Sequence, residues 1–404
     1  MAYIFNNEIK YADSENLDAF GRLRVSEITS LIDTKHVYDK NPLTINEVTN
    51  GTATSIFNKE NACVRMSTSA NNDYVIRQTK AHAIYQAGKG QIFEASFSNF
   101  AIETNVIKRV GAFVSSTAAT YDTVFDGFFL ESNGVTNEIS FKIFKSGSTT
   151  YSSTTANWYN ENYDVNDIDW SKTQLMLVDY QWLGVGRLRF GLNISGQTIY
   201  FGENNCANNQ NTVYMSSPSQ PIRYEIKQFG AGSGHFDMIC SQISSEGSLN
   251  ELFLTVSVIH SATTKLSTSG TKYPYIGYRL KPNYQGTVSQ LDKVCVLNTS
   301  NDNYLLTIEF NPTLSTTVTW VDLPNTPFEY ALGNGTPTVT SSGFITESII
   351  GQAGTTAVTT LQIKDNQVKP NTNINGTKDE VWVCLTPLSA NATFNGTANI
   401  LYYL

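Results

Sequence analysis

The dominant pattern along the chain is a two-residue alternation of apolar and polar side chains in short runs. DYVIRQT (73–79), QIFEASFS (91–98) and EISFKIFKSG (138–147) show it, and turn-forming stretches such as ESNG and NISGQ separate such runs. Successive side chains of a strand point to opposite faces, so the alternation predicts strands with one buried face. No window keeps the 3.6-residue apolar period of a helix for three turns, and we therefore predict an almost entirely β protein.

A second set of strand-like runs begins near residue 250, where Thr, Pro and Asn become more frequent; ELFLTVSVI, YLLTIEF and EVWVCLTPL belong to it. Many short antiparallel strands at close spacing are typical of sandwiches. We predict an N-terminal arm over residues 1–30, a large antiparallel β-sandwich of jelly-roll or lectin-like type over 31–245, and a second, smaller β-sandwich over 246–404. The boundary is placed at the Gly/Ser-rich stretch SSEGS (244–248).

The stretch RLRFGLNISGQTIYF (187–201) predicts a hairpin with its turn at Ser195–Gly196. Its alternation divides the first strand between two faces, with Arg187, Arg189 and Gly191 on one and Leu188, Phe190 and Leu192 on the other.

Composition limits the class of function. Charged residues make up 15% of the chain and the formal net charge is -8, without the clustered Lys/Arg face that phosphate binding needs, so we expect no nucleic-acid partner. No apolar run approaches the roughly 18 residues of a membrane span, and the first residues lack the pattern of a secretory signal. These features predict synthesis in a cytoplasm. The five widely spaced cysteines indicate reduced, buried thiols rather than a disulfide framework or a zinc site.

One short stretch near the start, ENLDAFGRLRVSE (15–27), concentrates charge in a chain that otherwise uses little of it. Its alternation puts Leu23 and Val25 on one face of a short strand and the guanidinium groups of Arg22 and Arg24 on the other. A single strand or ribbon is marginal in water, so this segment must dock onto something.

The acidic stretch YDVNDIDW (163–170) is the strongest candidate for ligand binding. Aromatic rings stack on the apolar face of a sugar while carboxylates bind its hydroxyl groups, which predicts a possible sugar site made of Trp158, Tyr159, Tyr163, Asp164, Asp167 and Asp169. A cation is an alternative, although Ile168 stands where a calcium loop needs an oxygen ligand and the required Gly is absent. A solvated turn before the next strand is the third interpretation.

No catalytic apparatus is visible. The four histidines, His36, His82, His235 and His260, are scattered, and no carboxylate pair suits glycoside hydrolysis. We therefore predict a protein that is not an enzyme, with no catalytic residues, no cofactor and no metal.

Five segments in order carry a resemblance to a known family: DAFGRLRVSE (18–27), LIDTKHVYDKNPL (31–43), DYQWLGVGRLRFGLNISGQTIYF (179–201), PIRYEI (221–226) and YIGYRLKP (275–282). Together they resemble a family of tailed-bacteriophage virion proteins, and the likeness spans nearly the whole chain. It implies a structural protein of the particle: a capsid decoration protein or head fibre, or a tail fibre component. Such a protein is made in the host cytoplasm, resides in the virion, and contacts other capsid or tail proteins.

The resemblance gives the arginine-rich stretch a role, as an attachment segment made of Asp18, Phe20, Gly21, Arg22, Leu23, Arg24 and Val25. In this hypothesis Leu23 and Val25 bury against a neighbouring protein while Arg22 and Arg24 pair with its acids. The alternative is that the segment covers its own sandwich. The resemblance and the 12% of aromatic residues also predict a homo-oligomer, specifically a trimer. Two other functions stay open, a module that binds host-surface carbohydrate and a polysaccharide depolymerase.

Overall fold

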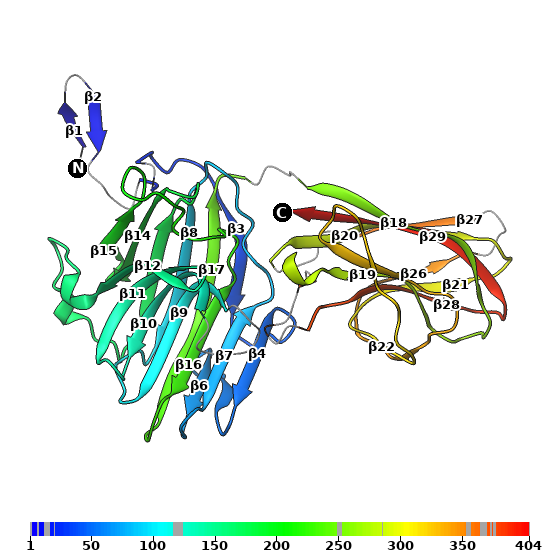
Figure 1. Cartoon of the computed structure of the whole chain (residues 1–404), viewed down its shortest axis with the longest axis horizontal. Coiled ribbons are helices and arrows are strands. Elements are labelled where there is room, and N and C mark those ends of the chain that lie inside the picture. Colours follow the sequence, from blue (N-terminus) through cyan, green and yellow to red (C-terminus); the bar gives the residue numbers. More distant parts are fainter. Residues whose placement is uncertain are drawn as a thin grey trace. The chain divides into compact units, whose positions relative to one another are not determined.

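The computed structural model describes residues 2–5, 8–11, 17–19, 21–115, 124–248, 253–284, 286–352, 357–363, 370–371, 374 and 377–403. Within these ranges the chain forms strands and three short 3-10 helices, and the strand pairings are antiparallel (Figure 1). The predicted all-β antiparallel fold is confirmed. The chain divides into two compact units, Met1–Asn250 and Glu251–Leu404. The first unit thus includes the stretch predicted as an arm, and it ends five residues beyond the predicted boundary.

Two sheets build the first unit. The seven-stranded sheet has the order β12 (Ser148–Thr154), β11 (Glu138–Lys145), β10 (Val124–Asn133), β9 (Val106–Ser115), β16 (Ile222–Gln228), β7 (Tyr74–Thr79) and β4 (Ile45–Asn50). The eight-stranded sheet has the order β15 (Gln197–Asn205), β14 (Arg187–Ile194), β13 (Gln174–Tyr180), β8 (Gln91–Ser98), β17 (Gly234–Glu246), β6 (Cys63–Thr68) and β5 (Thr54–Asn58), and β3 (Ile28–Lys35) also pairs with β17.

Aromatic side chains from both sheets meet between them and form the core of the first unit. The ring centroids of Phe128 on β10 and Phe93 on β8 lie 5.6 Å apart. Phe141 of β11 stacks on Phe190 of β14 with ring centroids 4.2 Å apart. Each of these side chains is almost completely buried. The contacts show that the alternating strands bury their apolar faces against each other, which makes the unit a sandwich.

Two short 3-10 helices, η1 (Thr155–Asn157) and η2 (Val165–Asp167), lie in the connection between β12 and β13. A separate two-stranded hairpin pairs β1 (Ala2–Phe5) with β2 (Glu8–Tyr11).

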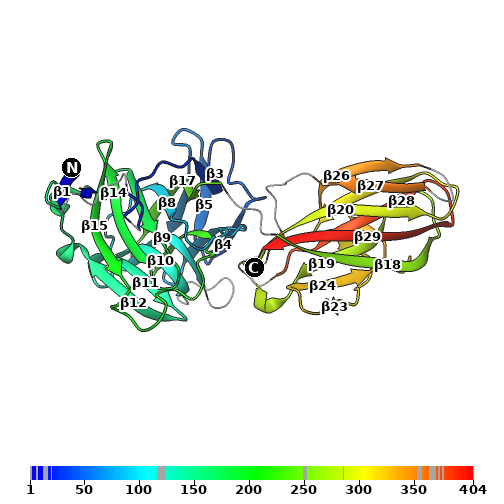
Figure 2. The same ribbon diagram turned by 90° about the horizontal axis from the view of Figure 1, so that it is seen from above.

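The second unit also has two principal sheets. The four-stranded sheet has the order β18 (Leu254–Leu266), β29 (Ala392–Tyr403), β20 (Val288–Asn298) and β27 (Ala357–Gln362); β29 lies between β18 and β20 (Figure 2). The six-stranded sheet has the order β23 (Val321–Asp322), β24 (Phe328–Leu332), β19 (Tyr273–Leu280), β28 (Val381–Pro387), β21 (Tyr304–Phe310) and β26 (Phe344–Gly351). The pair β22 (Thr313–Leu314) and β25 (Val339–Ser341) and the helix η3 (Pro282–Tyr284) complete it.

The second core again joins the two sheets through aromatic pairs. The ring centroids of Tyr304 on β21 and Phe394 on β29 lie 4.8 Å apart, and those of Phe328 on β24 and Tyr402 on β29 lie 5.3 Å apart. The second unit is therefore a sandwich as well, and β29 contributes to both contacts.

All five cysteines are free thiols, as the sequence predicted. Cys63, Cys206 and Cys384 are buried as expected, whereas Cys240 is exposed and Cys295 is intermediate.

Candidate functional site: the N-terminal segment and its carboxylates

Residues 17–27, which we call the N-terminal segment, are described at 17–19 and 21–27, and these residues form a tight loop on the first unit. Leu17 and Leu23 make an isolated antiparallel bridge, and the backbone amide of Asp18 donates to the carbonyl of Arg22 at 2.8 Å. Gly21 takes a positive φ of 77° at the turn, a conformation that favours glycine. Leu17, Asp18 and Ala19 are buried, so the start of the segment belongs to the packed part of the unit.

Arg24 connects the segment to two distant strands. Its Nη2 lies 2.5 Å from Oδ2 of Asp179 on β13, and its Nη1 lies 2.9 Å from Oε1 of Glu246, the last residue of β17. Its Nε also donates to the carbonyl of Leu17 at 3.0 Å, which closes the loop on itself. One guanidinium group therefore holds the segment to the eight-stranded sheet.

Two arginines of β14 bind the segment from the sheet side. Arg189 donates from Nε to Oδ2 of Asp179 at 2.9 Å and from Nη2 to the carbonyl of Leu17. Arg187 donates from Nε to the carbonyl of Ala19 at 3.2 Å. The polar face that alternation predicted for the 187–201 hairpin is thus the surface on which the segment lies, and the predicted apolar face of Leu188, Phe190 and Leu192 is buried as expected.

The acids around Arg24 form a crowded cluster. The pKa of Glu246 is raised to about 7, and burial is the largest cause. Arg24 opposes the rise, whereas the charges of Asp18 and Asp179 and a hydrogen bond with Asp18 contribute to it. Carboxylates near one another resist simultaneous ionisation. Oδ1 of Asp179 and Oε1 of Glu246 are buried and accept no hydrogen bond from the described part of the chain.

The structure places the predicted attachment residues differently from the hypothesis. Arg24 pairs with Asp179 and Glu246 of the same chain, and Arg22 pairs with Asp18 at 2.6 Å, so the acids are not those of a neighbouring protein. Phe20 lies outside the described residues. Sequence reasoning missed Asp179, Arg189 and Glu246, because nothing local marks residues so distant along the chain as partners of the segment.

The apolar side of the segment faces solvent. Leu23 is 45% exposed and Val25 87% exposed, and Ile28, the first residue of β3, is 59% exposed. β3 pairs with β17 on one side, and no strand among the residues that the structure describes pairs with its other edge. An unpaired edge offers backbone donors and acceptors to an incoming strand. The segment thus presents an apolar row beside an open sheet edge.

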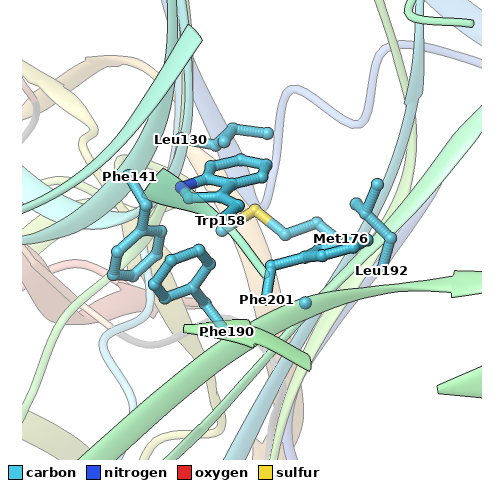
Figure 3. Close-up of a pocket in the computed structure, with 8 residues that line it drawn as sticks. Leu130, Phe141, Trp158, Met176, Phe190, Leu192 and Phe201 are labelled. Carbon is cyan, nitrogen blue, oxygen red and sulfur yellow. The ribbon is translucent and has the colours of Figure 1, made fainter. Parts of the chain in front are cut away.

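The predicted sugar site is largely a structural loop. Trp158 is 7% exposed and its ring stacks on Phe201 at 5.6 Å, among Leu130, Met176 and neighbouring aromatic residues (Figure 3). The cavity beside it has a free volume of about 10 Å³, at the limit of what one water needs, so no sugar ring fits there. The Trp158 ring is a core residue because the loop folds back over the sandwich interior.

The other members of that set lie on or near the surface. Tyr159 is 73% exposed, whereas Tyr163 packs against the core 6.3 Å from Phe201. Asp164 caps η2 by accepting from the backbone amide of Asn166 at 2.9 Å. Asp169 accepts from the amide of Ser171 at 3.0 Å and from its hydroxyl at 2.6 Å. Two of the acids therefore form turns.

Asp167, the last residue of η2, donates its backbone amide to the carbonyl of Asp164 at 3.0 Å. Within the described ranges no group of three or more His, Cys, Asp or Glu side chains is arranged to hold a metal.

A carboxylate pair that sequence reasoning did not single out lies on the seven-stranded sheet. Arg109 bridges it, with Nε 2.6 Å from Oε2 of Glu131 and Nη1 2.9 Å from Oε1 of Glu225. Burial opposes ionisation of Glu131, but Arg109 and Lys142 outweigh it and hold its pKa below the ordinary value. Glu131 is therefore ionised near neutral pH and is not a proton donor there. Polar residues inside apolar runs, as in FFLES and IRYEIK, were the available signal.

No protein-family model matches the chain, and no curated protein does. Among solved structures, the metal-free carbohydrate recognition domain of Emp46p has a TM-score of 0.35 and 11% identity, covering 55% of this chain and 97% of its own. The exoplasmic/lumenal domain of VIP36 in metal-free form has a TM-score of 0.34 and 11% identity, covering 56% of this chain and 95% of its own.

A carbohydrate esterase from Shiga toxin-encoding bacteriophage phi24B has a TM-score of 0.36 and 11% identity, covering 55% of this chain and 100% of its own. Scores and identities this low support no inference about function. No helix within the described residues is long and apolar enough to cross a membrane.

Proposed function

We propose that this protein is a non-enzymatic structural component of a tailed-bacteriophage particle, and that it docks on a neighbouring particle protein through the outward side of its N-terminal segment. The segment motifs that resemble the virion family support the first part. The second part rests on one observation: Leu23 and Val25 are held in solvent by a segment that Arg24 and Arg189 fix to the sandwich.

The fixed segment favours binding for two physical reasons. A surface that is already ordered loses little conformational entropy on association, and burying exposed apolar side chains contributes roughly 25 cal/mol per Å². The adjoining edge of β3 adds backbone hydrogen-bonding groups, and its first half, Ile28–Leu31, has no charged residue to discourage strand addition. The partner that fits is an extended segment with apolar side chains, added as a strand.

Point substitutions test docking better than truncation does, because removing the segment would also take the Arg24 guanidinium group from Asp179 and the Leu17 carbonyl from Arg189. We would replace Leu23 and Val25 together by Asp and measure incorporation of the full chain into assembled particles. The matched control is Val135→Asp, an exposed valine of the same unit. We expect loss of incorporation for the double variant only. Normal incorporation of a folded double variant would rule out this docking surface.

A second candidate function, recognition of host-surface glycan, is favoured by the exposed ring of Tyr159 beside the acidic loop. Glycan-array binding that Tyr159→Ala abolishes would support it. The predicted trimer stays a prediction, and light scattering of the whole protein tests it.

A further inference from the structure

Main-chain hydrogen bonds at the end of β17 fix the orientation of the backbone of β3. The amide of Gly247, just after β17, donates to the carbonyl of Glu27 at 3.0 Å. The amide of Glu246, one residue earlier, donates to the carbonyl of Gly90 at 3.0 Å, on the side where β8 lies. Ile28 is the residue of β3 opposite Glu246. The backbone between these strands is therefore hydrogen-bonded at Gly247 and turned away from β3 at Glu246.

This alternation determines which backbone groups of β3 point to its open edge. Opposite residues of an antiparallel pair alternate between hydrogen-bonded and non-hydrogen-bonded positions. The bond between Gly247 and Glu27 marks their pair as a hydrogen-bonded position, so Ile28 and Ser30 occupy non-hydrogen-bonded positions. The N–H and C=O groups of Ile28 and Ser30 thus point away from β17. They face the edge along which no strand of the described part of the chain pairs with β3.

The open edge is regular and uncharged over a short stretch only. Leu31 forms a β-bulge, because it has no opposite residue on β17, and a bulge disrupts the ladder locally. Beyond the bulge, Asp33 and Lys35 have exposed side chains whose charged groups lie 3.6 Å apart. On the other side the first charged residue is Glu27. A strand that adds to this edge therefore meets Ile28–Leu31 without meeting a charge.

We infer that the docking partner is a short uncharged strand, no longer than the Ile28–Leu31 stretch, which adds to the open edge of β3 through the backbone groups of Ile28 and Ser30. Each of these two residues offers one donor and one acceptor to the incoming strand. The inference rests on the proposed docking function and names the chemistry of its partner.

Charge decides the composition of the partner strand. A charged side chain placed against Ile28–Leu31 would lose its water without meeting an opposite charge, which costs free energy. Ile28 is 59% exposed, so an apolar side chain opposite it gains by burying that surface. The main-chain bonds contribute affinity for any extended segment, and these side-chain requirements select the uncharged one.

Proline at position 30 tests the backbone contact. Proline lacks the N–H group and is tolerated in strands where that group faces away from the ladder. Ser30→Pro therefore removes an outward donor and leaves the bonds to β17 in place. We expect incorporation of the full chain into assembled particles to fall by about tenfold or more. Ser30→Ala keeps the N–H group and is the matched control, with unchanged incorporation.

A second variant keeps the test decisive if Ser30→Pro fails to fold, which thermal unfolding would show. Ser30→Lys retains every backbone group and puts a charge into the uncharged stretch, and lysine on an edge strand discourages strand addition. It should also lower incorporation by about tenfold or more. Ser30→Gln, a long but uncharged side chain, is its control and should be incorporated normally.

Normal incorporation of the folded Ser30→Lys and Ser30→Pro variants would overturn the inference. If the Leu23 and Val25 double variant is then lost from particles, the docking surface stands and binds through its side chains alone. If that double variant is incorporated normally as well, the proposed docking function itself fails.

Discussion

Arg24 and Asp179 are 155 residues apart in the chain, and their Nη2 and Oδ2 atoms lie 2.5 Å apart. The Asp179 side chain is fully buried and also accepts two hydrogen bonds from Arg189 on the neighbouring strand. A buried carboxylate is stable only when its charge is compensated, and here the N-terminal segment supplies part of that compensation. The segment is consequently part of the architecture of the first unit, and only its outward side is available to a partner.

Asp179→Asn should destabilise the first unit strongly. The substitution leaves the guanidinium groups of Arg24 and Arg189 without their shared anion, and removing one member of a buried ion pair costs about 3–5 kcal/mol. Urea unfolding of the whole chain measures the free energy of unfolding, with peptide-level amide exchange assigning the transition. Glu203→Gln is the control, because Glu203 is exposed and its ion pair with Arg187 is worth less than about 1 kcal/mol. Equal effects of the two variants would contradict the role given to Asp179.

Acid should weaken the first unit through two buried histidines. Burial and the charge of Arg77 lower the pKa of His36 to about 4, and burial lowers that of His82 to about 4. Both histidines are neutral in the folded state, so each contributes fully to the free energy of unfolding above about pH 6.5. This contribution, up to about 3 kcal/mol for each histidine, is lost as the pH falls toward about 4.

Glu246 acts in the opposite direction over much of the same range. Its raised pKa stabilises the fold at acid pH, so Glu246→Gln should make the acid-induced loss of stability steeper, whereas His82→Gln should make it shallower. Calorimetry of the full chain between pH 4.5 and pH 7.5 compares the three proteins. A steeper curve for His82→Gln would show that the assigned sign is wrong.

Trp158→Ala should lower the stability of the first unit, whereas Tyr159→Ala should leave its stability almost unchanged. Trp158 is packed in the core, so its truncation should cost about 3–5 kcal/mol in the free energy of unfolding. Tyr159 is exposed, so its truncation should change stability by less than about 0.5 kcal/mol. Thermal unfolding of both variants checks this, and only the Tyr159 variant is informative in a glycan-binding assay.

Gly277→Ala should destabilise the second unit by about 1–3 kcal/mol. A Cβ at Gly277 would lie 2.7 Å from atoms of the fully buried Trp382 ring on the adjacent strand, so the ring or one of the two strands would have to shift. Ser348→Ala, at an exposed position of the same six-stranded sheet, is the control. Chemical denaturation followed by Trp fluorescence provides the measurement, and an unchanged midpoint for Gly277→Ala would contradict the packing argument.

The sequence was sufficient wherever a local pattern determines the structure. The hairpin of β14 and β15 was predicted with its turn, and Ser195 and Gly196 have φ values of 52° and 81°, as a two-residue turn of this kind requires. Alternation also predicted correctly that Leu188, Phe190 and Leu192 are buried, although Arg189 and Gly191 on the other face of β14 are buried as well. Both features depend on neighbouring residues only.

Sequence patterns were insufficient where burial depends on contacts between distant residues. Trp158 beside several acids has the composition of a sugar site, yet its burial follows from how the loop between β12 and β13 folds over the core. Similarly, the boundary between the two domains was placed at the polar stretch SSEGS, within which Ser244 and Ser245 are buried in a strand that pairs with β3 and β8. No local pattern reveals that polar residues will be enclosed in this way.

The position of β29 in the second unit has a consequence for synthesis on the ribosome. This strand pairs with β18 on one side and β20 on the other, although both precede it by about a hundred residues or more. The four-stranded sheet therefore cannot close until residues 392–403 have left the ribosome, whereas the strands of the first unit are complete at Glu246. At roughly 5–20 residues per second, translation of the intervening stretch gives the first unit on the order of ten seconds or more to fold alone. During that interval β18 and β20 lack their β29 partner, and their unpaired edges must be shielded by something other than the finished sheet.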